Sequence, residues 1–364
     1  MQNNGRLRAE INLSVIRSNW ATLQQLSGHA MASAVVKADA YGHGMAAVAK
    51  TLSQAGCSMF FTASIEEAAA LRAILPDADI AYFDGLASQD MEAVLTHRIM
   101  PSVGDGTQLQ YLETLAAQKG EPVPALLNID TGMNRLGTAP AFVHDMIDHD
   151  GFHAGDWRMV YSHLACADDP GHPMNQKQRE QFKASVAHPA LASIPKSLAA
   201  TGGIVLGGDY HFDVTRPGLG LYGLTPNGDP IKGLQPALSL KARVLQIRHA
   251  ESGETVGYGA SHPLSRKSRL ATIAGGYADG INRKLSGQGQ VRVADLTAPM
   301  IGRVSMDVHV IDITDWPAHA LAVGDWVTLV GDGLSVHDWA KNCDTIAYEM
   351  LTTLGLRAKR HYAD

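Results

Sequence analysis

The sequence predicts an α/β protein, a (β/α)8 barrel of the TIM type followed by a β-rich C-terminal domain. In the first two-thirds of the 364 residues, short apolar runs alternate with helical patterns, which indicates βαβ units and a parallel sheet. After about Lys232, β-branched and apolar runs are separated by glycines and Asp-Gly pairs, a pattern typical of an all-β domain. The length also suits two domains better than one.

About eight strand-and-helix units fill the first part, and roughly 200–250 residues is the usual size of a (β/α)8 barrel. A doubly wound parallel sheet remains the alternative, because periodicity alone does not separate the two folds. The expected strands are Ser33–Lys37, Ser58–Ala63, Asp79–Phe83, Arg98–Ser102, Ala125–Asp130, Arg158–His163, Lys196–Thr201 and Asp213–Pro217. The expected helices include Gly44–Gln54, Ser64–Ala73, Gly106–Lys119, Ala139–Asp148 and Asn175–Ala187.

The second part begins after a stretch rich in Pro, Gly and Asn, Leu224–Gly233, which is the expected linker. We therefore place the domains at residues 1–232 and 233–364. One helix near Cys343–Leu354 is expected to close the chain. The expected strands of this part are Pro236–Ala250, Arg269–Ala274, Gln290–Ala294, Val308–Asp312 and Trp326–Val330.

The composition excludes several classes of function. The net charge is −6, and Lys and Arg are scattered, so neither a nucleic-acid footprint nor an anionic membrane surface is indicated. Three widely spaced cysteines indicate free thiols in a reducing compartment, and no metal-ligand motif is present among the sixteen histidines. The polar N-terminus and the lack of a long apolar run predict a cytoplasmic protein.

Several residues able to do chemistry follow the expected barrel strands. In such a barrel the active site lies at the carboxyl ends of the strands, so these side chains are expected to converge. Lys37 follows an apolar run that would favour a neutral amine, which a Schiff-base lysine needs, although a lone lysine is usually a solvated charge. The other strand-end residues are Asp130, Arg135, His163, Thr201, Arg216 and Gly218.

These motifs, taken together and in this order, resemble the alanine racemase family over nearly the whole chain. The lysine motif is close to the cofactor signature of that family. The matching segments are Arg8–Leu13, Val36–Gly44, Asp130–Gly137, Tyr161–Ala165, Arg216–Leu219, Val256–Gly259, Gly276–Gly280, Gly302–Asp307, Ile346–Glu349 and Arg357–Tyr362.

The resemblance implies an isomerase that uses pyridoxal 5'-phosphate to interconvert L- and D-alanine and so supplies D-alanine for cell-wall peptidoglycan. Lys37 would hold the cofactor and then act as one base, with Tyr258 as the other base on the opposite face of the planar adduct. It also implies a head-to-tail homodimer in which the C-terminal domain of each subunit completes the partner's active site, so that Tyr258 would come from the partner subunit. His163 would hydrogen-bond to Tyr258, with Arg216 behind it facing the pyridine nitrogen.

The remaining site residues also follow from the resemblance. Arg135 and the backbone of Met306 would hold the substrate carboxylate, and Tyr277 would stand at the entrance to the site. The cofactor-binding residues would be Lys37, Tyr41, His163, Thr201, Arg216, Gly218, Leu219 and Tyr348.

The chain departs from the family pattern at two positions. Many members carry a carbamylated lysine where this chain has Asn128, and that negative charge would orient Arg135. A neutral asparagine cannot replace the charge, so a bound anion such as chloride is expected beside Asn128. Ala200 stands where the family usually has an asparagine, while Thr201 keeps a hydroxyl for the phosphate.

Other functions remain open at this stage. The substrate could be serine, lysine or arginine rather than alanine alone. Decarboxylases and aldolases share the pyridoxal-phosphate barrel, but Arg216 and the Val256–Gly259 motif argue against them. A non-catalytic cofactor carrier should lack the C-terminal domain and the opposing base.

Overall fold

The computed structural model describes residues 5–364, which divide into two units. One unit comprises Val15–Ala40 and Gly44–Gln235, and the other comprises the residues up to Ser14, Tyr41–His43 and Pro236–Asp364. Each unit is described by itself.

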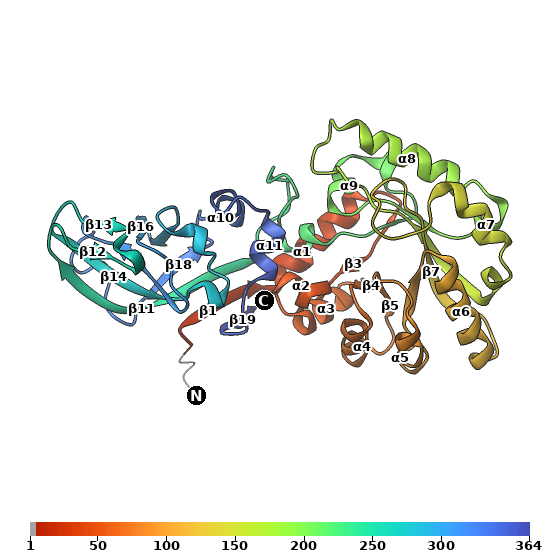
Figure 1. The fold of residues 1–364 in the computed structure, drawn as a ribbon, viewed down its shortest axis with the longest axis horizontal. Coiled ribbons are helices and arrows are strands. Elements are labelled where there is room, and N and C mark those ends of the chain that lie inside the picture. The colour runs from red at the N-terminus through yellow and green to blue at the C-terminus, as the bar shows by residue number, and fades with distance from the viewer. Residues whose placement is uncertain (1–4) are drawn as a thin grey trace. The chain divides into compact units, whose positions relative to one another are not determined.

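The first unit contains a parallel sheet whose seven strands follow one another in sequence order, from β3 to β9. In Figure 1, helices α4–α6 and α7–α9 lie on opposite sides of these strands. The strands of this unit are β2 (Met31–Ala32), β3 (Ala34–Val35), β4 (Met59–Thr62), β5 (Asp79–Tyr82), β6 (Met100–Val103), β7 (Val123–Asn128), β8 (Gly155–Tyr161), β9 (Lys196–Ser197) and β10 (Val214–Thr215). The helices are α1 (Leu13–Leu26), α2 (Lys37–Tyr41), α3 (Met45–Gln54), α4 (Ile65–Ile74), α5 (Met91–His97), α6 (Gly106–Lys119), α7 (Val143–Asp148), α8 (Pro173–Ser185) and α9 (Thr201–Val205).

Strand β10 closes this sheet into a barrel. It pairs in parallel with β2, and the Ser33 N–H donates to the Thr215 carbonyl at 3.0 Å. On its other side, the Arg216 N–H donates to the Ala199 carbonyl at 2.8 Å, just beyond β9. Strands β2 and β3 follow each other directly and occupy one position in the barrel. With this count, all eight expected strands are confirmed. The fold is therefore the barrel and not the doubly wound sheet.

Local signals explain where the barrel elements begin and end. Helix α6 starts where the Asp105 carboxylate accepts from the Gln108 N–H at 2.9 Å, and it ends at Gly120, whose φ is 80°. The inner strands read as continuous apolar runs because both of their faces are covered, and Phe60, Phe61 and Tyr82 are fully buried there.

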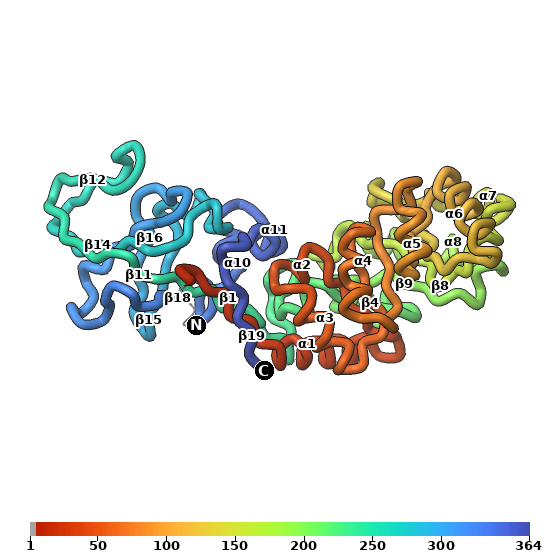
Figure 2. Tube along the Cα trace, turned by 90° about the horizontal axis from the view of Figure 1, so that it is seen from below, coloured from red at the N-terminus to blue at the C-terminus, as the bar shows by residue number. Residues whose placement is uncertain are grey.

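The second unit is built on an antiparallel sheet in the order β14-β17-β16-β15-β18-β11-β1-β19, with β1 parallel to β19. Figure 2 shows β12 on a loop that leaves this sheet beside β14. The strands are β1 (Leu7–Asn12), β11 (Leu238–Ala250), β12 (Thr255–Val256), β13 (His262–Pro263), β14 (Ser268–Ala274), β15 (Gln290–Val293), β16 (Leu296–Ile301), β17 (Val308–Asp312), β18 (Trp326–Val330) and β19 (Ala358–Ala363). Its late helices are α10 (Val336–Asn342) and α11 (Ala347–Thr352).

The helix expected near Cys343–Leu354 is present as α11, but it does not close the chain, because strand β19 follows it. A further helix, α10, precedes it, and the left-handed backbone of Asp344, with a φ of 54°, separates the two. The last element is strand β19, an edge strand with little burial, whose charged sequence shows no clear alternation.

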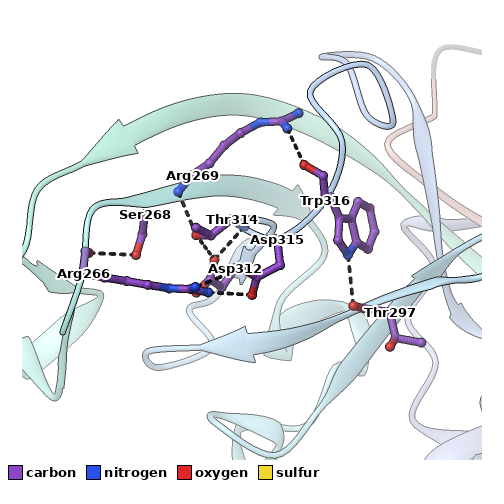
Figure 3. A network of polar contacts seen from close by, with 8 residues as sticks. All are labelled: Arg266, Ser268, Arg269, Thr297, Asp312, Thr314, Asp315 and Trp316. Carbon is purple, nitrogen blue, oxygen red and sulfur yellow. Dashed lines mark hydrogen bonds and ion pairs between the residues drawn. The ribbon is translucent and has the colours of Figure 1, made fainter.

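A polar network ties β14 to the chain that follows β17 (Figure 3). Arg266 donates to both carboxylate oxygens of Asp315, at 2.9 and 2.6 Å, and the Arg269 N–H donates to the Thr314 hydroxyl at 3.0 Å. The Trp316 indole N–H donates to the Thr297 carbonyl at 3.0 Å. These contacts satisfy side chains and backbone groups where the β ladder ends.

Candidate functional site

Lys37 lies just beyond β3 and directly before a left-handed turn. The φ angles of Ala38, Asp39 and Ala40 are 52°, 52° and 55°, and that of Tyr41 is 53°. This conformation costs roughly 1–2 kcal/mol for each residue with a side chain, so the surroundings must hold it in place. Strain of this kind is concentrated at functional sites.

The surroundings of Lys37 favour a neutral amine. Burial is the largest cause that lowers the pKa of Lys37 below its ordinary value, and the positive charge of Arg135 lowers it further. The carboxylates of Glu67 and Asp84 act in the opposite direction without reversing the shift. A lysine with a lowered pKa is suited to nucleophilic or base chemistry.

Arg216 is a buried guanidinium surrounded by neutral acceptors. It follows β10 and is 2% exposed. Its Nη1 donates to the Ser197 hydroxyl, and its Nη2 donates to the Ser162 carbonyl at 2.5 Å. Its Cζ lies 5.0 Å from the centre of the Tyr161 ring. Burial lowers the pKa of Arg216 to about 10, so the side chain stays positively charged at neutral pH.

His163 follows β8 and is held neutral. Burial lowers the pKa of its imidazole to about 3, with the positive charge of Arg216 as the next largest cause. Its backbone carbonyl accepts from the Gln178 side-chain amide at 2.8 Å, which fixes this position. At neutral pH His163 can therefore assist a neighbour through a hydrogen bond but not through a positive charge.

Thr201 lies against the backbone of the Gly218–Gly220 segment. The buried Thr201 hydroxyl accepts from the Gly218 N–H at 3.2 Å and from the Gly220 N–H at 3.1 Å. A Cβ on Gly220 would come within 2.9 Å of the Thr201 methyl group, so only glycine fits there. The two glycine amides thus point at Thr201 rather than into open space.

Asn128 and Arg135 line one polar cavity of about 210 Å³ at the ends of β6 and β7. Asp130 shapes the loop between them, because its carboxylate accepts from the backbone N–H groups of Gly132 and Met133 at 2.8 Å and of Arg135 at 3.0 Å. Burial raises the pKa of Asp130, but these backbone donors outweigh it, and the net pKa lies below the ordinary value. The cavity is lined by Phe83, Gly85, Ser102, Gly104, Asp105, Gln108, Asn128, Arg135, Leu136 and Gly137.

The second unit brings Met306 and Tyr277 onto adjacent loops, with Tyr258 on a loop of its own. The N–H of Tyr277 donates to the Ser305 carbonyl at 3.0 Å, and the N–H of Ala278 donates to the Met306 carbonyl at 3.1 Å. Tyr258 is 72% exposed, Met306 is 51% exposed and Tyr277 is 45% exposed. These three predicted site residues therefore present large side chains to solvent in the single chain.

Sequence reasoning assigned no role to Arg357, which ties these loops together. Its Nε lies 2.7 Å from Asp279, in the same short helical turn as Tyr277, and its Nη1 lies 2.7 Å from Asp307, beside Met306. The sequence shows Arg357 as part of a family motif. The fold is needed to show that Arg357 binds the carboxylates of Asp279 and Asp307.

Tyr41 and Tyr348 form a tilted aromatic pair with ring centres 6.0 Å apart. Tyr41 ends the left-handed turn, and Tyr348 lies on α11. Burial, followed by the influence of Tyr348, raises the pKa of the Tyr41 phenol above its ordinary value. Tyr41 is therefore a neutral hydrogen-bonding group at neutral pH.

Comparison with known proteins identifies the family to which this fold and these residues belong. The model of the alanine racemase N-terminal domain matches residues 11–226, and that of the C-terminal domain matches residues 237–362. The chain belongs to the alanine racemase family. A curated relative from Rhizobium meliloti (strain 1021), named alanine racemase, is 40% identical over 370 residues, which cover 98% of this chain and 96% of the relative. A relative from Agrobacterium fabrum, named alanine racemase, biosynthetic, is also 40% identical, over 98% of this chain and 93% of its own length.

Solved structures of the family have the same fold. The alanine racemase of Bartonella henselae, with covalently bound pyridoxal phosphate, is 38% identical with a TM-score of 0.93, and the match covers 98% of this chain and 99% of that one. The enzyme of Streptomyces lavendulae, a producer of D-cycloserine, is 31% identical with a TM-score of 0.93, over 100% of this chain and 98% of that one.

The barrel residues fit pyridoxal phosphate, the cofactor of this family. Lys37 supplies an amine with a lowered pKa, as covalent attachment requires. The buried Arg216 charge has neutral partners on the protein side, so it can still donate to an acceptor such as a pyridine nitrogen. An arginine at this point gives up its proton much less readily than a carboxylic acid would.

Proposed function

We propose that the chain racemises alanine on pyridoxal phosphate by a two-base mechanism, with Lys37 and Tyr258 as the bases. The observation that carries the proposal is the pairing of a low-pKa Lys37 amine with a buried, charged Arg216 in one barrel. The full-length similarity to proteins named alanine racemase supports alanine as the substrate.

Racemisation requires a proton to leave the α-carbon on one face and to return on the other. Bound pyridoxal phosphate supplies the electron-withdrawing ring that makes this proton acidic enough to remove. Lys37 takes or returns the proton on one face through its Nζ, and Tyr258 does so on the other face through its phenol oxygen. His163, neutral at neutral pH, supports Tyr258 by a hydrogen bond.

Arg216 sets the type of reaction. Because its pKa remains near 10, it donates a hydrogen bond to the ring nitrogen without handing over a proton. Beside Arg216 the bound ring would withdraw electrons less strongly than beside a carboxylic acid. This environment would favour rapid return of the proton to the α-carbon over transamination and decarboxylation.

The other predicted residues bind the two ends of the substrate and cofactor. Arg135 and the backbone of Met306 hold the substrate carboxylate, and Tyr277 stands at the entrance. Tyr41, Thr201, Gly218, Leu219 and Tyr348 surround the phosphate. The Thr201 hydroxyl now accepts from two glycine amides, and it keeps its own proton to donate to a phosphate oxygen.

We also infer a homodimer in which the β-rich unit of one subunit, which contains Pro236–Asp364, completes the site formed by the barrel unit of its partner. The exposure of Tyr258, Met306 and Tyr277 supports this assignment, because these large side chains are open to contact from a partner subunit. A cytoplasmic role in supplying D-alanine for peptidoglycan agrees with the three free cysteines, Cys57, Cys166 and Cys343. Among residues 5–364, no helix is long and apolar enough to span a membrane.

Product analysis tests the function. With pure L-alanine, the purified protein should form D-alanine until the two enantiomers are equal in amount, and no carbon dioxide should be released. Parallel assays with serine, lysine and arginine measure the substrate range. Loss of the carboxylate as carbon dioxide would assign a decarboxylase instead, and an unchanged substrate would assign a non-catalytic cofactor carrier.

A bound anion beside Asn128 is the next prediction. A chloride ion in the polar cavity would hold the Arg135 guanidinium through a charge-assisted hydrogen bond. Replacing chloride with a large organic anion at constant ionic strength should raise KM for alanine about tenfold, as expected for one lost hydrogen bond to a charged group. Asp105 also lines the cavity, and its carboxylate accepts from the Gln108 N–H.

The variant Asn128→Asp is the matched control for the anion. Its carboxylate would replace the bound ion, so its KM should no longer depend on chloride. If the wild-type kinetics stay the same in both salts, Arg135 is held by the protein and water alone, and the anion site is wrong.

A further inference from the structure

The left-handed turn after Lys37 is held at its far end by its own residues. The Asp39 carboxylate accepts from the Met45 N–H at 2.7 Å, and the Asp39 carbonyl accepts from the Gly44 N–H at 2.8 Å. These bonds join the turn to the start of α3. At the end where Lys37 lies, the turn itself supplies one further bond, from the Ala40 N–H to the Val36 carbonyl at 2.9 Å.

Glu67 holds the near end of the turn. It lies in the first turn of α4, and its Oε1 accepts from the Ala38 N–H at 2.6 Å. Its Oε2 accepts from the Ala63 N–H at 3.0 Å, directly after β4. One carboxylate thus uses both oxygens to join the chain after β3 to the chain after the neighbouring strand, β4.

The neighbouring Glu66 has a different environment. It is exposed on the same helical turn, and its hydrogen bond to the Ser64 hydroxyl lowers the pKa of its carboxyl group. Two acidic residues in the first turn of a helix are ordinarily explained by the helix dipole. That explanation covers Glu66 but not a Glu67 carboxylate that binds two backbone N–H groups outside the helix.

We propose that Glu67 is a positioning residue for Lys37: its carboxylate fixes the Ala38 backbone and so sets the direction from which the Lys37 amine reaches the substrate. The inference rests on the proposed function, in which Lys37 is a base. The N–H of Ala38 belongs to the peptide bond that begins at Lys37, so a shift of this amide turns the Lys37 Cα and its side chain. A base displaced by about 1 Å loses roughly 10²-fold in rate.

Glu67 also contributes its charge. The charged groups that act on Lys37 are Arg135, which lowers its pKa, and Glu67 and Asp84, which raise it. His163 is also coupled to Lys37, but it is neutral at neutral pH. Removing the Glu67 charge should therefore lower the pKa of the Lys37 amine. The acid limb of kcat, which reports groups in the substrate complex, should move to lower pH.

The test compares Glu67→Gln with Glu66→Gln in the holoenzyme. Glu67→Gln has the same shape but keeps one acceptor oxygen where two are needed, and it has no charge. We expect kcat to fall with KM for alanine nearly unchanged, and the acid limb of kcat to move to lower pH. Glu66→Gln removes the same charge one residue away and should leave kcat and its pH profile at the wild-type values.

Hydrogen exchange provides a readout that does not depend on activity. The peptide containing Ala38 should exchange roughly tenfold faster in Glu67→Gln than in the wild type, and peptides from the Figure 3 network should exchange at wild-type rates. Glu67→Ala should lower kcat by roughly 10²-fold. If Glu67→Ala does not fold, the results for Glu67→Gln alone decide whether Glu67 positions Lys37.

The outcomes separate this inference from the proposed function. A wild-type protein that forms no D-alanine would overturn the proposed function, whatever the Glu67 variants do. An active wild type, together with a Glu67→Gln variant that matches Glu66→Gln in kcat, pH profile and exchange, would overturn the role of Glu67 alone.

Discussion

Replacing Lys37 with alanine should abolish racemisation and leave the protein unable to bind pyridoxal phosphate covalently. The substitution removes both the attachment point and one of the two bases. We therefore expect a loss beyond the upper end of general acid–base contributions, about 10⁴-fold. The rate of D-alanine formation measures the loss. The visible absorption of the purified wild type, and its disappearance on treatment with borohydride, reports the carbon–nitrogen bond to the cofactor.

Lys50→Ala is the matched control for this prediction. Lys50 is an exposed lysine on α3, so its removal should leave the absorption and the activity at wild-type values. After borohydride reduction, the label should be recovered on the peptide that contains Lys37. Recovery of the label on another lysine would remove Lys37 from the mechanism. A small primary amine added to Lys37→Ala should restore part of the activity, because it replaces the missing base.

Much of the fold could be predicted because the local signals agree with the tertiary structure. The helix expected at Gly106–Lys119 is present with the same bounds, since Asp105 and Gly120 mark its two ends. The strands Val308–Asp312 and Trp326–Val330 are also present as predicted, because each is rich in β-branched residues and is bounded by turns. These elements need no distant contact to define them.

The elements that the sequence did not reveal depend on distant partners. Strand β19 carries two basic residues and lies at a sheet edge, so it reads as a polar tail until its pairing with β1 is seen. The break at Asp344 depends on a left-handed backbone that aspartate adopts only in certain surroundings. In both cases tertiary structure decides between local alternatives of similar free energy.

In the candidate site, too, some residues could be found from local sequence signals and others only from their contacts in the fold. The rule that chemistry lies at strand ends made Lys37, His163 and Arg216 candidates, but their roles follow only from the family resemblance of the motifs taken together. It could not select Glu67, because a glutamate at the start of a helix has an ordinary explanation. The contacts of its carboxylate with the Ala38 and Ala63 N–H groups distinguish it from Glu66.

Tyr258→Phe should retain the cofactor but lose racemisation by roughly 10²–10⁴-fold, the range for one general acid or base. The loss of kcat/KM must be equal in both directions, because the two enantiomers have the same free energy. Exchange of the α-hydrogen with deuterated water should differ between them. The enantiomer whose α-hydrogen faces Lys37 should still exchange, and the other should lose exchange along with racemisation.

Tyr362→Phe is the control, since Tyr362 is another exposed tyrosine of the same unit and should retain full activity. Small and equal losses of exchange for both enantiomers would exclude Tyr258 as a base.

If the two bases come from different subunits, mixing unfolded Lys37→Ala and Tyr258→Phe chains and refolding them should restore activity. Half of the dimers would be mixed, and each mixed dimer would have one intact site, so about a quarter of the wild-type activity should return. If no activity returns although mixed dimers form, both bases must come from the same chain, because every site would then lack one of them.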